Sequence, residues 1–274
     1  MNSHADTKVL EVENLAISDR HTGRVLVRGI QFSLARGGRL GIVGESGSGK
    51  SLTCKAILGI LPDNLHVSAG RIRFDGHDVT HFSHEDWLPL RANRISAVFQ
   101  DPGSYLNPSI PVGRQLAQVL RHRAGLPVQD IHARTLELFR QVGLRDPAQV
   151  HDRYPHELSG GMLQRIVIAI AVAAEPILLI ADEATTALDV TVQAEVLDLI
   201  SDLREQRALS LVFISHDLAV VSQVADHVIV MRDGAVVEAG PTHRVLSAPA
   251  DSYTQLLIQD HLEYGLDKFL HQGA

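Results

Sequence analysis

Two glycine-rich stretches of this chain have the composition needed to hold an anion. The first, GESGSGKS at 44–51, fits the pattern G-x-x-x-x-G-K-[ST] and lies between an apolar run and a helical pattern. Its glycines would let successive backbone N–H groups surround phosphates, while Lys50 would reach the β- and γ-phosphates and the Ser51 hydroxyl would ligate Mg²⁺. The residues expected at this phosphate site are Gly44, Glu45, Ser46, Gly47, Ser48, Gly49, Lys50, Ser51 and Leu52.

The second stretch, LSGGMLQR at 158–165, lies far from the first along the chain. Ser159 can cap the helix that the following residues predict, and Gly160 and Gly161 would let a ligand approach the backbone at the helix start. A chain that already has one phosphate loop therefore carries a second predicted anion site.

A pair of carboxylates follows an apolar run, in ILLIADEA at 177–184. Asp182 and Glu183 would lie at the end of a buried strand, where carboxylates cost free energy unless they meet a cation or take part in chemistry. We expect Asp182 to hold Mg²⁺, directly or through water, and Glu183 to polarise the attacking water as the general base. The alternative, two solvated carboxylates at a strand end, is less favoured in a chain with a phosphate loop.

Gln100 and His216 each follow a predicted strand. Gln100 comes after ISAVF and could contact both the metal-bound water and whatever docks on the helical region that follows. His216, in LVFISHD, is placed to bond a γ-phosphate, although a lone histidine is more often structural. The other histidines among the 15 are scattered without ligand spacing, so we expect no metal site built from them.

The composition is that of an ordinary soluble globular protein, with 45% hydrophobic and 21% charged residues among 274. A formal net charge of -7 and 4% aromatic residues argue against a nucleic-acid binder, which would need a basic surface or stacking rings. Cys54 is the single cysteine, so an intrachain disulfide is impossible and a buried small side chain is the favoured interpretation. The start, MNSHADTKVLEVENL, lacks the apolar segment of a signal peptide, and no apolar run reaches the about 20 residues of a membrane span. We therefore expect a chain that stays inside the cell.

The pattern of apolar residues predicts an α/β fold. Apolar runs at 40–43, 177–181, 211–214 and 228–231 lack polar alternation, as expected of parallel strands buried on both faces. The amphipathic pattern over 191–207 predicts a helix packed on such a sheet. Residues 9–38 alternate and are interrupted by His21-Thr22-Gly23, which predicts a small antiparallel sheet. A helical insertion at about 103–165 and a short tail at about 242–274 complete one predicted domain, 1–274.

These pieces together resemble one family. GESGSGKS, the glutamine of VFQDP, LSGGMLQR, ADEATTALD and ISHD occur in the order and approximate spacing of ATP-binding cassette (ABC) ATPases, over nearly the whole chain. The resemblance implies an ABC-type P-loop NTPase fold, ATP and Mg²⁺ as cofactors, and two nucleotide domains packed head to tail. Ser159, Gly160 and Gly161 would then contact the γ-phosphate of the partner's ATP, and Asp189 would join the two sites across the interface. The second glycine-rich stretch would thus serve the ATP of another chain.

Within that family the chain resembles the peptide and nickel importer branch, in FQDPGSYLNPSIPVGRQL, TTALDVTVQAEVLDLI and APADSYTQLL. Within this branch the chain most resembles the first ATPase subunit of nickel importers, in the segments GSGKSLTCKAILGILP, SGGMLQR and HLEYGL. This resemblance implies a peripheral subunit at the cytoplasmic face of the membrane. Its implied partners are a second related ATPase subunit, two permease subunits and an extracytoplasmic solute-binding protein. Peptides or another metal chelate as cargo stay open, as does a soluble ABC protein that regulates an enzyme complex.

Two positions depart from the family pattern. Ala184 stands where the family usually has proline after the catalytic glutamate, which would loosen that turn without removing a catalytic group. No aromatic residue lies just before Val25, where the family stacks a ring on adenine, and His21 is the nearest candidate.

Overall fold

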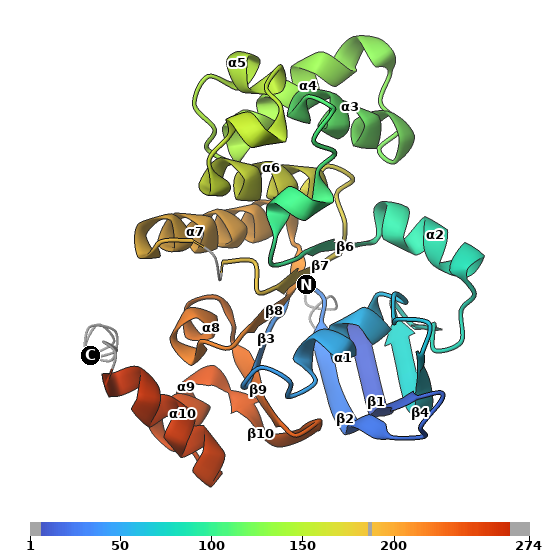
Figure 1. The fold of residues 1–274 in the computed structure, drawn as a ribbon, viewed down its shortest axis with the longest axis vertical. Coiled ribbons are helices and arrows are strands. Elements are labelled where there is room, and N and C mark those ends of the chain that lie inside the picture. The colour runs from blue at the N-terminus through green and yellow to red at the C-terminus, as the bar shows by residue number, and fades with distance from the viewer. Residues whose placement is uncertain (1–6, 186–187, 264–274) are drawn as a thin grey trace, which may run out of the picture. The chain divides into compact units, whose positions relative to one another are not determined.

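The computed structural model describes residues 7–185 and 188–263, which form two compact units (Figure 1). One unit lies within Met1–His84 and Ser210–Ala274, and we call it the loop unit after its phosphate loop. The other lies within Glu85–Leu209, and we call it the helical unit. The start of the chain, where we expect no signal peptide, lies partly outside the described residues, as do Thr186 and Ala187 of TTALD and the end of the predicted tail. The assignment of 1–274 to a single domain stays a prediction.

The first sheet of the loop unit is antiparallel, as the alternating pattern predicts. β1 pairs with β2 on one side and with β4 on the other, in the order β2-β1-β4-β5. The apolar side chains of β1 are buried, which stabilises the sheet by removing them from water. The strands are β1 (Lys8–Asp19), β2 (Val25–Ala35), β4 (Leu65–Phe74) and β5 (His77–Asp78).

The second sheet of the loop unit is mixed and positions the phosphate loop. β3 runs parallel to β8 and to β9, and β9 pairs antiparallel with β10. β3 and β8 are almost entirely buried, which explains their apolar runs without alternation. The strands are β3 (Arg39–Val43), β8 (Ser210–Ser215), β9 (His227–Arg232) and β10 (Ala235–Pro241). The helices are α1 (Lys50–Ile57), α8 (Leu218–Val224), α9 (Thr242–Ser247) and α10 (Ser252–Glu263).

The helical unit combines two parallel strands with most of the helices. β6 (Ile95–Val98) pairs with β7 (Leu178–Asp182), and each strand lies in the sequence segment that predicts it. The predicted insertion contains α3 (Val112–His122), α4 (Val128–Gln141) and α5 (Pro147–His151), with short 3-10 turns at Pro102–Tyr105 and Pro155–Glu157. The remaining helices of this part are α2 (His84–Asn93), α6 (Gly160–Val172) and α7 (Val190–Arg207).

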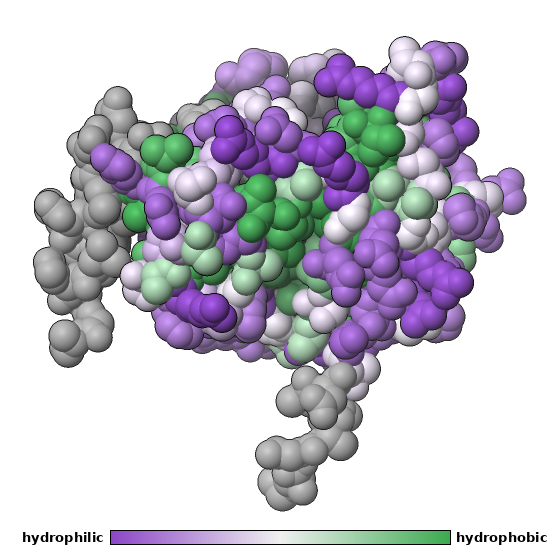
Figure 2. Space-filling view, turned by 90° about the horizontal axis from the view of Figure 1, so that it is seen from below, coloured by the Kyte–Doolittle hydropathy of each residue, from purple (hydrophilic) through white to green (hydrophobic). Residues whose placement is uncertain are grey.

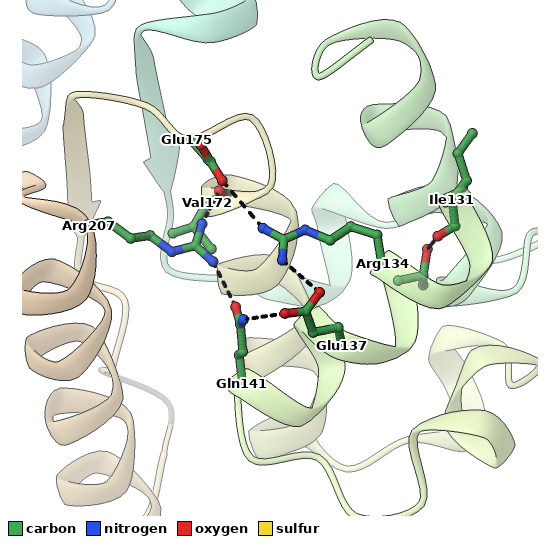
Figure 3. Close-up of polar contacts among 8 residues, drawn as sticks. Ile131, Arg134, Glu137, Gln141, Val172, Glu175 and Arg207 are labelled. Atoms are coloured by element: carbon green, nitrogen blue, oxygen red, sulfur yellow. Dashed lines mark hydrogen bonds and ion pairs between the residues drawn. The ribbon is translucent and has the colours of Figure 1, made fainter. Parts of the chain in front are cut away.

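A polar network ties the end of α7 to α4 and to the end of α6 (Figure 3). Arg207, the last residue of α7, donates 2.8 Å hydrogen bonds to the Val172 carbonyl and to Gln141 Oε1. Gln141 donates to Glu137, which also accepts from Arg134 at 2.8 Å. Burial lowers the pKa of Arg207, and the hydrogen bond from Arg134 lowers the pKa of the Glu137 carboxyl. The network therefore fixes where three helices end relative to one another within the helical unit.

Among the described residues, no helix is both long enough and apolar enough to span a membrane. On the face drawn in Figure 2, hydrophobic residues gather in patches between hydrophilic ones.

The α/β class with an antiparallel sheet, a mixed core sheet and inserted helices is confirmed.

Candidate functional site

The phosphate loop joins the end of β3 to the start of α1, in the order that the sequence predicts. Gly49 takes the N-cap position of α1 with a φ of 101°, a conformation that glycine adopts without steric cost. Lys50 is 4% exposed, and its Nζ donates to the carbonyls of Gly44 at 2.7 Å and Glu45 at 2.8 Å. A buried ammonium group held by two carbonyls of its own loop has partners that anionic phosphate oxygens can replace.

Gly44 fixes how closely the loop approaches the end of β9. A Cβ built on Gly44 would lie 2.1 Å from the carbonyl oxygen of Met231, far inside contact distance. The N–H of Gly234, in the turn between β9 and β10, donates to the Ser48 carbonyl at 3.1 Å. The loop therefore lies close to β9 at its start and is hydrogen-bonded to the turn after β9 at Ser48, and only glycine fits at position 44.

Tyr253 contributes a contact to the loop that the sequence reasoning missed. Its hydroxyl accepts a 3.0 Å hydrogen bond from the backbone N–H of Glu45, 208 residues earlier in the chain. The sequence offered one signal, the APADSYTQLL stretch, which served only as a mark of resemblance. Burial is the first cause of a raised pKa for the Tyr253 phenol, so the hydroxyl stays protonated and uncharged at neutral pH.

The two carboxylates at the end of β7 differ in their surroundings. Asp182 is the last residue of β7 and is 6% exposed, while Glu183 is half-buried just beyond the strand. Glu183 has a φ of 51°, a left-handed conformation that is uncommon for a residue other than glycine. Backbone strain of this kind is concentrated at functional sites, because the surrounding structure must hold it.

The starts of α6 and α7 lie side by side in the helical unit. Ser159 Oγ accepts from the Met162 N–H at 3.3 Å at the start of α6, and Asp189 Oδ1 accepts from the Val192 N–H at 3.0 Å at the start of α7. A Cβ on Gly161 would lie 2.8 Å from Val192 Cγ1, which shows how close the helix starts are. Two adjacent helix N-termini with exposed caps favour a negatively charged ligand. The predicted cap at Ser159 is confirmed.

Gln100, His216 and His21 are all exposed to solvent. Gln100 follows β6 in the helical unit, and His216 directly follows β8 in the loop unit, next to Asp217, which caps α8. His21 lies in the turn after β1, where its N–H donates to Asp19 Oδ1 at 2.9 Å. Each residue therefore occupies the strand end or turn that the sequence predicts for it, and the catalytic and adenine-binding roles stay predictions.

Each unit, taken by itself, carries groups that suit a nucleotide phosphate or a divalent cation. The loop unit supplies the glycine loop, Lys50 and the Ser51 hydroxyl, and Gly47 has a φ of 85° and open space where a Cβ would stand. Within the helical unit, the Asp182 carboxylate and the exposed Gln100 amide carry oxygen atoms of the kind that Mg²⁺ prefers. Among the described residues, no three histidine, cysteine, aspartate or glutamate side chains form a cluster suited to a metal ion.

Known proteins resemble this chain both in sequence and in structure. The family profile described as ABC transporter matches residues 27–186. The chain is 45% identical over 254 residues to the dipeptide transport ATP-binding protein DppD of Lactococcus lactis, covering 91% of this chain and 72% of that protein. It is 39% identical to the metal-staphylopine import system ATP-binding protein CntD of Staphylococcus aureus, over 96% of this chain and 99% of that protein. Among solved structures, cbiO1 of Clostridium perfringens, part of the transporter complex cbiONQ, matches with a TM-score of 0.78 and 28% identity, covering 95% and 100% of the two chains.

Proposed function

Because the chain belongs to the ABC transporter family, we propose that it is the ATP-hydrolysing subunit of a membrane importer whose cargo is a dipeptide or short oligopeptide. The observation that supports this most strongly is the identity of 45%, across 91% of the chain, to a dipeptide transport ATP-binding protein. The resemblance of several segments favoured a nickel importer, with peptides as the alternative. The relatives support the peptide alternative better.

A metal chelate is the second candidate cargo. The metal-staphylopine import protein is matched over 99% of its length, which favours an importer that carries a transition metal bound to a small organic ligand. Nickel, free or chelated, would fall in this class. The chain residues discussed above are proposed to act on ATP, so they support either cargo equally.

The ATP chemistry is assigned to residues at strand ends and in the loop. In the proposed reaction the γ-phosphoryl group of ATP is transferred to water, which gives ADP and phosphate, and a bound Mg²⁺ would neutralise phosphate charge. Lys50 and the backbone N–H groups of the loop hold the phosphates, and His216 bonds the γ-phosphate. Glu183 orients and deprotonates the attacking water as general base. The proposed Mg²⁺ ligands, directly or through water, are Ser51, Gln100 and Asp182.

The adjacent starts of α6 and α7 are proposed to face the ATP of a second, related ATPase subunit. Ser159, Gly160 and Gly161 would contact its γ-phosphate, and Asp189 would link the two nucleotide sites. If the open pair dominates by 99 to 1 without ATP and the closed pair by the same ratio with it, ATP must favour closure by about 5.5 kcal/mol. Contacts made only in the closed pair supply that difference, and hydrolysis removes them.

The proposed assembly places the chain peripherally at the cytoplasmic face of the membrane. Two permease subunits would bind near Gln100 and the helices after it, and a solute-binding protein would deliver the cargo from the other side. Purification from detergent-solubilised membranes tests this assembly. Recovery of permease subunits with the chain supports the importer, whereas recovery of a soluble enzyme complex would support a regulatory ABC protein instead.

The cargo is tested in cells that lack this chain. Uptake of a labelled dipeptide and cell-associated nickel, measured by elemental mass spectrometry under metal limitation, are compared before and after complementation. We expect wild type, and not Glu183→Gln, to restore dipeptide uptake. Restoration of nickel alone would move the assignment to the metal chelate class, and no effect on either would refute an importer of these cargoes.

A further inference from the structure

Tyr253 contacts the phosphate loop at one end and Arg232 with the face of its ring. It is in the first turn of α10, it is 4% exposed, and the Arg232 guanidinium lies 4.8 Å from the centroid of its ring. This distance is typical of a cation–π contact, which orients the ring. The hydroxyl at the far end of the ring accepts the hydrogen bond from the Glu45 N–H.

The start of α10 is itself held by carboxylates. Glu238 on β10 accepts from the N–H groups of Ala250 at 2.8 Å and Asp251 at 3.1 Å. Asp251 Oδ1 in turn accepts from the Tyr253 N–H at 2.8 Å. The position of Tyr253 is therefore set by β10 and α10, independently of the loop that it contacts.

The peptide unit between Gly44 and Glu45 is bonded on both sides. Its carbonyl accepts from Lys50 Nζ at 2.7 Å, and its N–H donates to Tyr253 at 3.0 Å. When Lys50 turns to phosphates, it must give up loop carbonyls. The bond to Tyr253 does not involve Lys50, so it can persist when phosphates are bound.

We propose that Tyr253 is a positioning residue for nucleotide binding, whose hydroxyl keeps the first peptide unit of the phosphate loop in place while Lys50 exchanges the loop carbonyls for phosphates. The inference rests on the proposed function of the loop as the ATP site. Lys50 supports this peptide unit in the free protein, so loss of the hydroxyl affects the nucleotide-bound loop most. α10, which lies outside the phosphate-loop motif, thereby becomes part of the nucleotide site.

Tyr253→Phe in the full-length chain tests the proposal, because it retains the ring and its contact with Arg232. A neutral hydrogen bond of this kind corresponds to about a two- to tenfold change in an equilibrium constant. We expect the dissociation constant of MgATP and the KM for ATP to rise by that factor, with kcat at saturating ATP changing by less than about twofold. Amide hydrogen exchange at Glu45 should become faster, while the thermal unfolding temperature changes little.

Tyr154→Phe is the matched control, since it removes the hydroxyl of a partly exposed tyrosine in the helical unit. Arg232→Gln is a second variant, which leaves the hydroxyl but removes the cation over the ring, and it should accelerate exchange at Glu45 less than Tyr253→Phe does. Unchanged Glu45 exchange and ATP affinity in folded Tyr253→Phe would overturn the proposal, as would an equal loss of ATP affinity in Tyr154→Phe.

Failure of the proposed function gives a different result. If Lys50→Ala left ATP binding at the wild-type level, the loop would not be the ATP site, and both proposals would fall. If Lys50→Ala abolished binding while Tyr253→Phe behaved as wild type in both measurements, only the role of Tyr253 would be refuted.

Discussion

Gly160 offers a substitution that separates stability from function. It is the first residue of α6, it is exposed, and a Cβ built on it meets no heavy atom within 4 Å. Alanine at this position adds a methyl group to open space and restricts the unfolded chain. We therefore expect Gly160→Ala to raise the free energy of unfolding by about 0.4–1 kcal/mol.

The same methyl group would stand where the partner's γ-phosphate is proposed to approach the N–H groups at the start of α6. Hydrogen bonds to charged groups contribute about 1.5–3 kcal/mol each. Displacing the phosphate from one of them should therefore slow ATP hydrolysis by roughly 10- to 150-fold. We therefore expect a variant that is more stable and much less active. A packing defect would lower the stability as well, so it cannot explain that combination.

Gly161→Ala is the matched control for packing. Its Cβ would lie 2.8 Å from Val192 Cγ1, so we expect overpacking to cost about 1–3 kcal/mol of the free energy of unfolding. Adding Val192→Ala removes the opposing methyl groups and should recover much of this loss. Gly160→Ala needs no such compensation.

Urea unfolding gives the stabilities, and ATP hydrolysis by the co-purified transporter complex gives the activities. Wild-type hydrolysis by Gly160→Ala would refute the proposed approach of the partner's phosphate to this glycine. A lower free energy of unfolding for Gly160→Ala would refute the structural argument, because it would mean that the space beside Gly160 is filled.

Three further predictions address other residues. Glu183→Gln should bind ATP with near wild-type affinity, lose most hydrolysis and accumulate a closed pair of ATPase subunits, and undiminished hydrolysis would exclude Glu183 as the base. Arg207→Met should lower the free energy of unfolding in urea by about 1–3 kcal/mol, because it leaves the carbonyl at the end of α6 without its donor, whereas Arg145→Met at an exposed position should not. The Asp19 carboxyl should titrate with a pKa of about 2 rather than 3.8, mainly through the hydrogen bond from the Thr22 N–H, so its contribution to stability is present above pH 3.8 and lost as the pH falls through about 2. Carboxyl NMR checks that value, and titration at 3.8 would mean that the turn does not form these hydrogen bonds.

Much of the local structure could be predicted because it depends on residues near one another in the sequence. The glycine loop follows β3 and begins α1, and the amphipathic pattern at 191–207 forms α7 at Val190–Arg207. The prediction that Cys54 is buried is confirmed, since it is 0% exposed. Periodicity and cap residues carry this information directly.

The contacts that the sequence did not reveal join distant segments. Tyr253 binds a backbone N–H 208 residues away, and a backbone donor leaves no mark in the side-chain sequence. The left-handed φ of Glu183 is likewise invisible, because glutamate is not a residue type that signals such a conformation. The sequence favoured nickel over peptides as the cargo, and the relatives support peptides better. The motifs that carried the resemblance are proposed to act on ATP, so they do not distinguish the two cargoes.

The burial of Cys54 has a practical consequence for spectroscopy. It is the single cysteine of the chain, and it is 0% exposed in α1. A maleimide dye needs an accessible thiolate, so the natural chain should label very slowly while it is folded. A cysteine introduced at exposed Val128 or Leu256 could then carry a fluorophore selectively, with Cys54 left in place. A single dye at either site would then be carried by a protein whose core has not been altered.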